Sequence, residues 1–314
     1  MKIPKIEQHP KLINANLASG GEGSAFALSM VSEMFQLHNA TSRFPYPFHG
    51  VTSTLTSNHF DEWILESAYE ASAEKIFQTV RKEGNGYFKN IAHKTHQTAD
   101  DFFEFAREAL AELPDFSDSE LLENYEKFMA RYAQDFSVGI ITFLYEAILS
   151  ERLMRLLARQ VANPAALLPH LFKTGYVSFM TQSEQMLNNL ACAKRLQEKH
   201  KLIRAYLENF FFIDTNYGSA PILNKKDILR KIKRVVSYRV LQKRTRVPKI
   251  VLTSEERALV DLLRETEEIR DQRKKINLIG TYVMFRFLDQ VVARRNLNSS
   301  LAKNIFWFEF EDLL

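Results

Sequence analysis

The sequence is poor in the residues that break helices or cross-link chains. Glycine and proline number 10 and 9 among 314 residues, well below their usual shares of about 7% and 5%. A single cysteine, Cys192, excludes an internal disulfide. It stands in the stretch NNLACAKRL with no histidine nearby, so we expect it to be a small buried apolar residue. Few turn-formers and no cross-links favour a helical protein.

Long apolar runs are also missing. No stretch reaches the roughly 18 residues that a membrane span requires, and the opening MKIPKIEQHPKLINANL lacks the apolar core of a signal peptide. We therefore expect a cytoplasmic location and no membrane partner. The length allows two domains or one large helical body. Apolar residues make up 46% of the chain and include 24 phenylalanines, which is enough for a substantial core.

Apolar residues recur at spacings of three and four along most of the chain, which predicts helices. We expect helices at about 24–38, 58–83, 98–113, 118–160 and 182–198, a further segment to 212, a basic helix capped by Asn224, and a terminal helix of about 40 residues ending near 296. The stretches 1–20, 42–58 and 174–185 look irregular, and no convincing strand series or internal repeat is present. The sequence predicts an all-α fold, an elongated bundle of long helices with little or no sheet. An N-terminal part would cover 1–160 and a C-terminal part 161–314, or both would form one continuous domain.

Motifs for catalysis and metal binding are weak. The stretch SGGEGSA lacks the Lys-Ser/Thr of a phosphate loop and a preceding strand, so we interpret it as a flexible entry to a helix. His93 and His96 are three residues apart and could share a metal on a helix, but no carboxylate or cysteine completes a ligand set in sequence. No nucleophile elbow, HExxH or paired CxxC occurs. We assign no catalytic residue and no metal site.

Positive charge is concentrated in one segment. The net charge is +4, but residues 225–249 hold eleven basic residues and one acid, a local charge of +10, so the rest of the chain sums to −6. One interpretation is a solvated helix face. The other is a basic patch, with Arg230, Lys233 and Arg234, that faces polyphosphate, nucleotide or nucleic acid. Tyr238 is its lone aromatic residue, which counts against a single-strand binding platform.

The terminal helix carries cations inside an apolar stripe. Arg270, Arg273 and Lys274 interrupt it, and Arg273 falls near the stripe itself. An arginine there must be paired or must open to a water-filled cleft. One interpretation is an internal ion-pair ladder that includes Glu265. The other is an arginine that faces an anion in a cleft, since planar guanidinium suits phosphate and carboxylate.

Three segments resemble the helical region of the phosphoenolpyruvate-utilising enzymes, such as pyruvate phosphate dikinase and phosphoenolpyruvate synthase, and are most similar to the rifampin phosphotransferase type. The first is SFMTQSEQMLNNLACAKRL. The second holds Phe211–Phe212 and Tyr217–Gly218 but lacks the family's tryptophan. The third is LLRETEEIRDQRKKINLIGTYVMFRFLDQVVARRNL with its Arg-x-x-Arg-Lys pattern, followed by FWFEFEDLL. The resemblance covers roughly residues 101–314.

The resemblance implies a helical domain that binds an acceptor and presents it to a phosphohistidine on a swivelling carrier domain, with an ATP-grasp domain supplying the phosphoryl group, in cis or in trans. No Thr-x-His in a glycine-rich setting occurs here, and the family's carrier domain commonly follows the element that ends this chain at Leu314. ATP and Mg²⁺ would bind the partner domain, so we expect no cofactor in this chain and no catalysis by it alone. Tyr217, Arg270, Arg273 and Lys274 would bind a small-molecule acceptor, and Phe210–Phe212 would hold the turn at 214–218 beside the cleft.

A different class of function stays open beside this one. The chain would then be a helical interaction or nucleic-acid-binding protein that uses the basic 225–249 segment. It predicts binding to nucleic acid that weakens steeply with salt.

Overall fold

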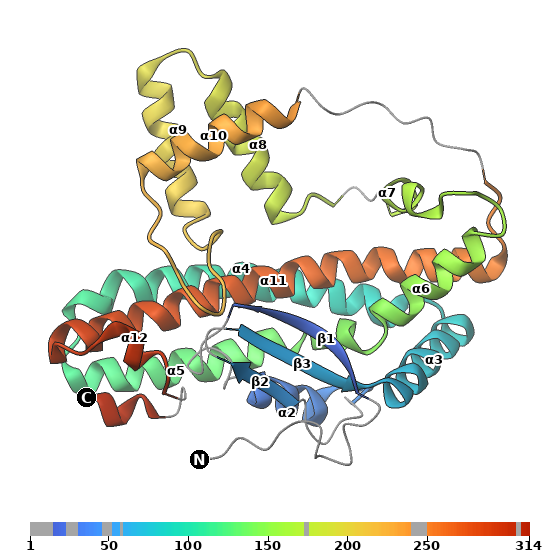
Figure 1. The fold of residues 1–314 in the computed structure, drawn as a ribbon, viewed down its shortest axis with the longest axis horizontal. Helices are drawn as coiled ribbons and strands as arrows, with labels where there is room; N and C mark the ends of the chain where they lie inside the picture. The colour runs from blue at the N-terminus through green and yellow to red at the C-terminus, as the bar shows by residue number, and fades with distance from the viewer. Residues whose placement is uncertain are drawn as a thin grey trace.

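The computed structural model describes residues 15–22, 31–45, 52–56, 59–172, 176–239, 250–305 and 309–314. Helices dominate this part of the chain, which confirms the all-α prediction (Figure 1). The helices are α2 (Val31–Thr41), α3 (Glu66–Glu83), α4 (Gly86–Glu112), α5 (Asp118–Ser137), α6 (Glu146–Leu157), α7 (Leu168–Leu171), α8 (Phe179–Cys192), α9 (Leu196–Asn209), α10 (Lys225–Arg239), α11 (Ser254–Arg295) and α12 (Ser299–Ala302). Short 3-10 turns are η3 (Leu113–Asp115), η4 (Ile140–Leu144), η5 (Pro164–Ala166) and η7 (Glu311–Leu313). Within the described residues, we find no helix with the length and apolar character needed to cross a bilayer.

A small antiparallel sheet accompanies the helices and was not predicted. Strands β1 (Ala15–Glu22), β2 (Thr52–Thr56) and β3 (His59–Leu65) pair in the order β1-β3-β2. The expectation that the stretches 1–20 and 42–58 are irregular is therefore wrong in part, and so is a helix that begins at residue 58. Threonine fills alternate positions of β2, and β-branched residues favour strands. Half of the SGGEGSA stretch belongs to β1, and the start of the helix predicted at 24–38 lies outside the described residues.

The helix predicted over 118–160 is broken in the middle. Helix α5 ends at Ser137, the 3-10 turn η4 follows, and α6 begins at Glu146. At the break the side chain of Arg273 from α11 packs directly on Gly139, since a Cβ added to Gly139 would be 2.6 Å from the Cβ of Arg273. Two other predicted boundaries also differ. Helix α4 begins at Gly86 rather than near residue 98, and α8 begins at Phe179, where the Ser178 side chain accepts a hydrogen bond from the amide of Thr181.

Helix α11 is the longest of the described helices. Its predicted length of about 40 residues is confirmed, since it has 42 residues. It begins in a capping box formed by Thr253 and Glu256, in which each side chain bonds the other residue's amide. It ends at Asn296, whose φ of 52° is left-handed. Its neighbours are α4, α5 and α6, and Figure 1 shows α4, α5 and α11 running side by side.

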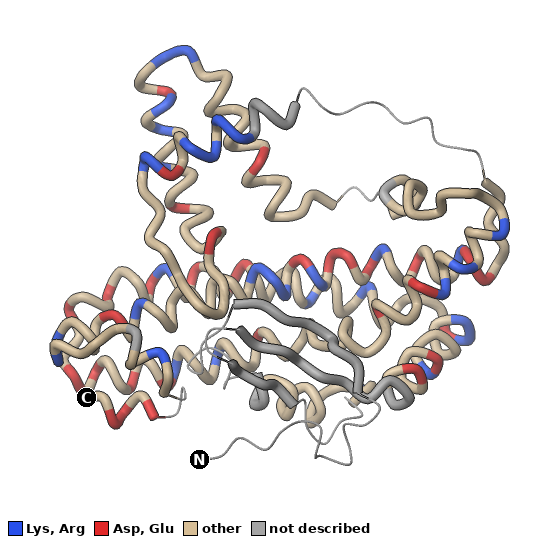
Figure 2. The backbone as a smooth tube through the Cα atoms, viewed as in Figure 1, with Lys and Arg blue, Asp and Glu red and all other residues tan. Residues whose placement is uncertain are grey.

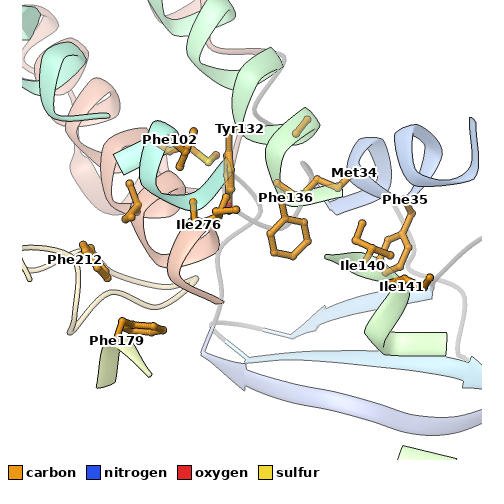
Figure 3. Close-up of a cluster of buried hydrophobic side chains, with 14 of the residues drawn as sticks. Met34, Phe35, Phe102, Tyr132, Phe136, Ile140, Ile141, Phe179, Phe212 and Ile276 are labelled. Atoms are coloured by element: carbon orange, nitrogen blue, oxygen red, sulfur yellow. The ribbon is translucent and has the colours of Figure 1, made fainter. Parts of the chain in front are cut away.

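Two hydrophobic clusters organise the described residues. The larger one fills the body between α4, α5, α11 and η4, and Figure 3 shows part of it, including Phe102, Tyr132 and Ile276. The smaller one joins α8, α9 and α10 through Leu187, Leu190, Ile203, Tyr206, Phe210, Leu223 and Ile228. We call the unit formed by α8, α9 and α10 the arm; it stands away from the body at the upper left of Figure 1. The predicted division at residue 160 stays a prediction, although the larger cluster draws residues from both sides of it.

Cys192 is exposed, so its predicted burial is wrong. It is the last residue of α8, directly before the turn into α9. The apolar face of α8 that packs in the arm holds Leu187 and Leu190 instead.

Candidate functional site

A cleft of about 640 Å³ lies along the middle of α11. The start of α8, the turn after α9 and the residues around η4 form its walls. Six of its lining residues belong to α11, and the rest come from segments more than 50 residues away in sequence. The lining consists of Phe136, Phe143, Phe172, Tyr176, Ser178, Met180, Thr181, Tyr217, Glu267, Arg270, Asp271, Arg273, Lys274 and Asn277.

All four residues predicted to bind an acceptor line this one cleft. Tyr217 comes from the turn, and Arg270, Arg273 and Lys274 come from consecutive turns of α11. Arg270 is about half exposed and forms an ion pair with Glu146 of α6. Lys274 is exposed. The structure thus brings the predicted residues together; whether they bind a ligand stays a prediction.

Arg273 is the most buried of these cations, with 9% of its surface exposed. Its Nη1 donates a hydrogen bond to Thr142 Oγ1 at 2.8 Å, and its guanidinium carbon lies 3.7 Å from the centre of the Phe143 ring. A planar guanidinium stacks well on an aromatic face. The aliphatic part of the side chain passes over Gly139, where any larger residue would collide with it. Arg273 therefore reaches the cleft in a defined orientation while most of it is covered by protein.

Tyr217 is held by a chain of hydrogen bonds from the core. The side-chain Nδ2 of Asn277 donates a hydrogen bond to the Tyr217 hydroxyl at 2.9 Å. The buried Tyr132 hydroxyl in turn donates to Asn277 Oδ1 at 2.6 Å. In the turn itself, Asn216 Oδ1 accepts from the amides of Gly218 and Ser219, both at 2.8 Å. These contacts fix the turn beside the cleft.

The three consecutive phenylalanines join the arm to the body. Phe210 belongs to the cluster of the arm, whereas Phe212, 1% exposed, belongs to that of the body. The Phe211 ring lies between them against Tyr282, with ring centres 5.0 Å apart. Figure 3 shows Phe212 beside Phe179, at a ring separation of 6.0 Å. The stretch is thus packed on both sides directly before the turn that carries Tyr217.

Two carboxylates share the cleft with the cations. Asp271 accepts hydrogen bonds from the Tyr176 hydroxyl and, at 3.0 Å, from the amide of Phe179. Burial raises the pKa of Asp271 above its ordinary value, and the hydrogen bonds from Tyr176 and Phe179 oppose this shift. Burial likewise raises the pKa of Glu267, with Arg270 acting in the opposite direction. The acids offset most of the cationic charge, so the cleft suits one anionic group rather than a polyanion.

Tyr176 is one of the cleft residues that sequence reasoning missed. Its hydroxyl donates a hydrogen bond to the Asp271 carboxylate and accepts one from the side-chain Nε2 of Gln272 at 2.6 Å. Both partners lie about a hundred residues further along the chain, so no local sequence pattern predicts these contacts. Burial raises the pKa of Tyr176, and its acidic partner Asp271 raises it further.

A metal site does not form among the described residues, where no group of three or more His, Cys, Asp or Glu side chains has suitable geometry. His96 lies 3.6 Å from Asp100 and 3.6 Å from Glu268, and its Nδ1 is 3.3 Å from the Gln272 amide. The basic patch is separate from the cleft: Arg230, Lys233 and Arg234 are exposed on α10 and none of them lines it.

Comparisons with known proteins gave no match. No protein-family model matches the chain, and neither the curated proteins nor the solved structures contain a significant relative. The resemblance to phosphoenolpyruvate-utilising enzymes is therefore neither supported nor contradicted by them, and it stays a prediction.

Proposed function

We propose that this chain is the helical acceptor-binding domain of a phosphotransfer system. Its cleft binds a small molecule that carries an anionic group and an apolar or aromatic part, and presents a hydroxyl or carboxylate of that molecule to a phosphohistidine on another domain. The contribution of this chain is positioning and charge stabilisation. We infer a cytoplasmic setting for this reaction.

The observation that carries the proposal is the lining of the cleft. Arg270, Arg273 and Lys274 offer donors to one anion, and the rings of Phe136, Phe143 and Tyr176 offer flat apolar walls. Ligand sites commonly combine apolar walls with a few placed polar groups. The resemblance of α11 and the α8 region to the family adds a second, independent reason, because the same segments form the cleft.

The proposed partners are those that the family resemblance implies. An ATP-grasp domain, in cis or in trans, binds ATP and Mg²⁺, and a swivelling domain carries the phosphoryl group on histidine. A direct test is to incubate the isolated protein with labelled ATP or phosphoenolpyruvate and to assay acid-labile phosphohistidine. We expect none, and a stable phosphohistidine on this chain would contradict the division of labour.

Binding to the cleft can be tested with minimal probes. Benzoate combines a ring with a carboxylate, and benzamide has nearly the same shape without the charge. We expect benzoate to bind more tightly than benzamide by about tenfold or more, because a hydrogen bond to a charged group contributes about 1.5–3 kcal/mol. Titration followed by protein NMR would measure both.

Variants of α11 locate the effect. Arg270→Gln and Lys274→Gln should each weaken benzoate binding and leave benzamide unaffected. Arg264→Gln is the matched control, because Arg264 lies on the same helix but does not line the cleft. It donates hydrogen bonds to the carbonyl oxygen of Leu171 and to the carboxylate of Asp261. Equal loss in the control, or no preference for benzoate, would contradict the cleft assignment.

A further inference from the structure

The arm is the most basic part of the described structure. Residues 178–239 contain twelve basic and five acidic residues, a net charge of +7, whereas the complete chain carries +4. Figure 2 shows Lys and Arg at the turn between α8 and α9 and along α10. The charge of the arm therefore exceeds that of the whole protein, and the remainder is acidic overall.

Two basic segments far apart in sequence meet in this unit. On the turn before α9 and on α9 itself, Lys194, Arg195, Lys199, Lys201 and Arg204 are all exposed. On α10, Lys225, Lys226, Arg230, Lys233 and Arg234 are exposed as well. The charge count along the sequence identified only the second group. Helices α9 and α10 both pack against α8 in the cluster around Tyr206 and Ile228, so the two groups of cations belong to one structural unit.

Few acidic residues of the arm offset this charge. Asp227 forms an ion pair with Arg230 at 2.6 Å, and Asp214 pairs with the partly buried Lys231. Glu198 and Glu208 are the exposed acids of α9. An exposed surface with so large an excess of one sign creates a potential that attracts polyanions.

The apolar side of the arm is already used in packing. Ile228 of α10 is fully buried, and Ile203 and Tyr206 of α9 are buried in the same cluster. A basic amphipathic helix that binds a membrane needs a free apolar face to insert. Here the described apolar residues at the centre of that face are packed. Beyond Met180 at the cleft, only scattered large apolar side chains, Leu196, Ile222 and Leu229, are exposed among the described residues of the arm, which favours a hydrophilic polyanion over a lipid surface.

Among the described residues of the arm, no phenylalanine, tyrosine or tryptophan side chain is exposed, and the exposed ring is the imidazole of His200. Beyond Met180 at the cleft, the exposed large apolar residues there are Leu196, Ile222 and Leu229, and the rings of Tyr206 and Phe210 are buried. Single-strand binding proteins stack bases on such rings. Contacts to phosphates alone need only lysine and arginine and suit a regular duplex.

We propose that the arm binds double-stranded nucleic acid through its phosphates, without reading the bases, using the exposed cations of α9 and α10. This function uses a surface separate from the cleft and does not depend on the acceptor-binding proposal. It predicts micromolar or weaker binding at physiological salt and a steep dependence on salt concentration, as is typical of non-specific binding.

The test measures fluorescence anisotropy of a labelled duplex of mixed sequence across a salt series, with the full chain. The variant combines Arg230→Glu, Lys233→Glu and Arg234→Glu. Each lost phosphate contact lowers the slope of log affinity against log salt by about 0.9 on B-form DNA. We expect the slope to fall by roughly three and the affinity at about 0.1 M salt to fall on the order of 100-fold or more.

The control variant carries the same change of charge on the body, with Lys82→Glu, Arg155→Glu and Arg159→Glu, all of which are exposed residues. It should retain most of the affinity. Equal loss in the control, unchanged binding in the arm variant, or tighter binding of a single strand of the same sequence would overturn the proposal. So would binding to phosphatidylserine vesicles in place of duplex, since a lipid surface would then be the partner.

Discussion

Replacing Gly139 by alanine should destabilise the protein and displace Arg273 from its place in the cleft. An added Cβ would lie 2.6 Å from the Cβ of Arg273 and 2.9 Å from its Cγ. Real Cβ atoms do not approach other carbon atoms so closely, so η4 or α11 must shift. The φ of Gly139 is −89°, which alanine adopts freely. The expected effect is therefore steric and does not come from backbone strain.

The magnitude follows from two opposing contributions. Overpacking of a well-filled region costs about 1–3 kcal/mol. Replacing glycine also lowers the conformational entropy of the unfolded chain, which stabilises the folded protein by about 0.4–1 kcal/mol. We expect a net loss of on the order of 1–2 kcal/mol, which corresponds to a fall in Tm of roughly 1.5–3 °C for a chain of 314 residues. The affinity for benzoate should fall as well, because the Arg273 side chain would move away from its contacts with Thr142 and Phe143.

Differential scanning calorimetry and a benzoate titration would check this prediction. Gly86→Ala is the matched control, because nothing lies within 4 Å of a Cβ added there. It should leave Tm unchanged or raise it slightly. If Gly139→Ala were as stable as the control and bound benzoate normally, the close packing of α11 against η4 would be refuted.

Three further predictions concern α11. Gly280→Ala should destabilise the protein more than Gly139→Ala, since its Cβ would lie 2.3 Å from the buried Tyr132 ring; urea unfolding would measure this, and an equal or smaller loss would contradict it. Asp271→Asn should gain stability relative to wild type as pH rises from about 4 to 7, because burial raises the pKa of Asp271 in the folded protein. The folded wild type binds this proton more tightly than the unfolded chain, which stabilises it at low pH, and this stabilisation is lost as pH rises through the folded pKa. A stability difference between variant and wild type that stays constant across this range would count against the burial of Asp271. Arg273→Met should reduce the preference for benzoate over benzamide with no loss of stability, and unfolding of this variant at ordinary temperature would show instead that the arginine is structural.

Patterns local to α11 were enough to predict much of the site. Thr253 and Glu256 mark the start of the helix, and Asn296 is typical of its end. Arg270, Arg273 and Lys274 are three and four residues apart, so they fall on neighbouring positions of one helix face. Their interruption of an apolar stripe left two interpretations open, an internal ion-pair ladder and a cleft, and the structure contains a cleft there.

The features that were missed depend on tertiary contacts. Helix α5 ends at Ser137, next to the place where Gly139 packs on Arg273. These two residues are 134 positions apart in the chain, and no window of sequence contains both. Tyr176 enters the cleft through a hydrogen bond to Asp271, which is 95 residues away. The sheet was missed for another reason: its strands are short, with 5 to 8 residues each, and alternation over so few residues is a weak signal.

The placement of Arg273 argues for a functional role over a stabilising one. Covering a charged side chain costs free energy, and a well-packed apolar residue of similar volume is often neutral or stabilising in its place. The contacts with Thr142 and Phe143 compensate for part of that cost, but they do not require an arginine to fill the space. A methionine would pack against Phe143 and over Gly139 without any charge to desolvate. A chain selected for stability alone has no reason to place a guanidinium on a largely apolar face, whereas a chain that binds an anion in the adjacent cleft does.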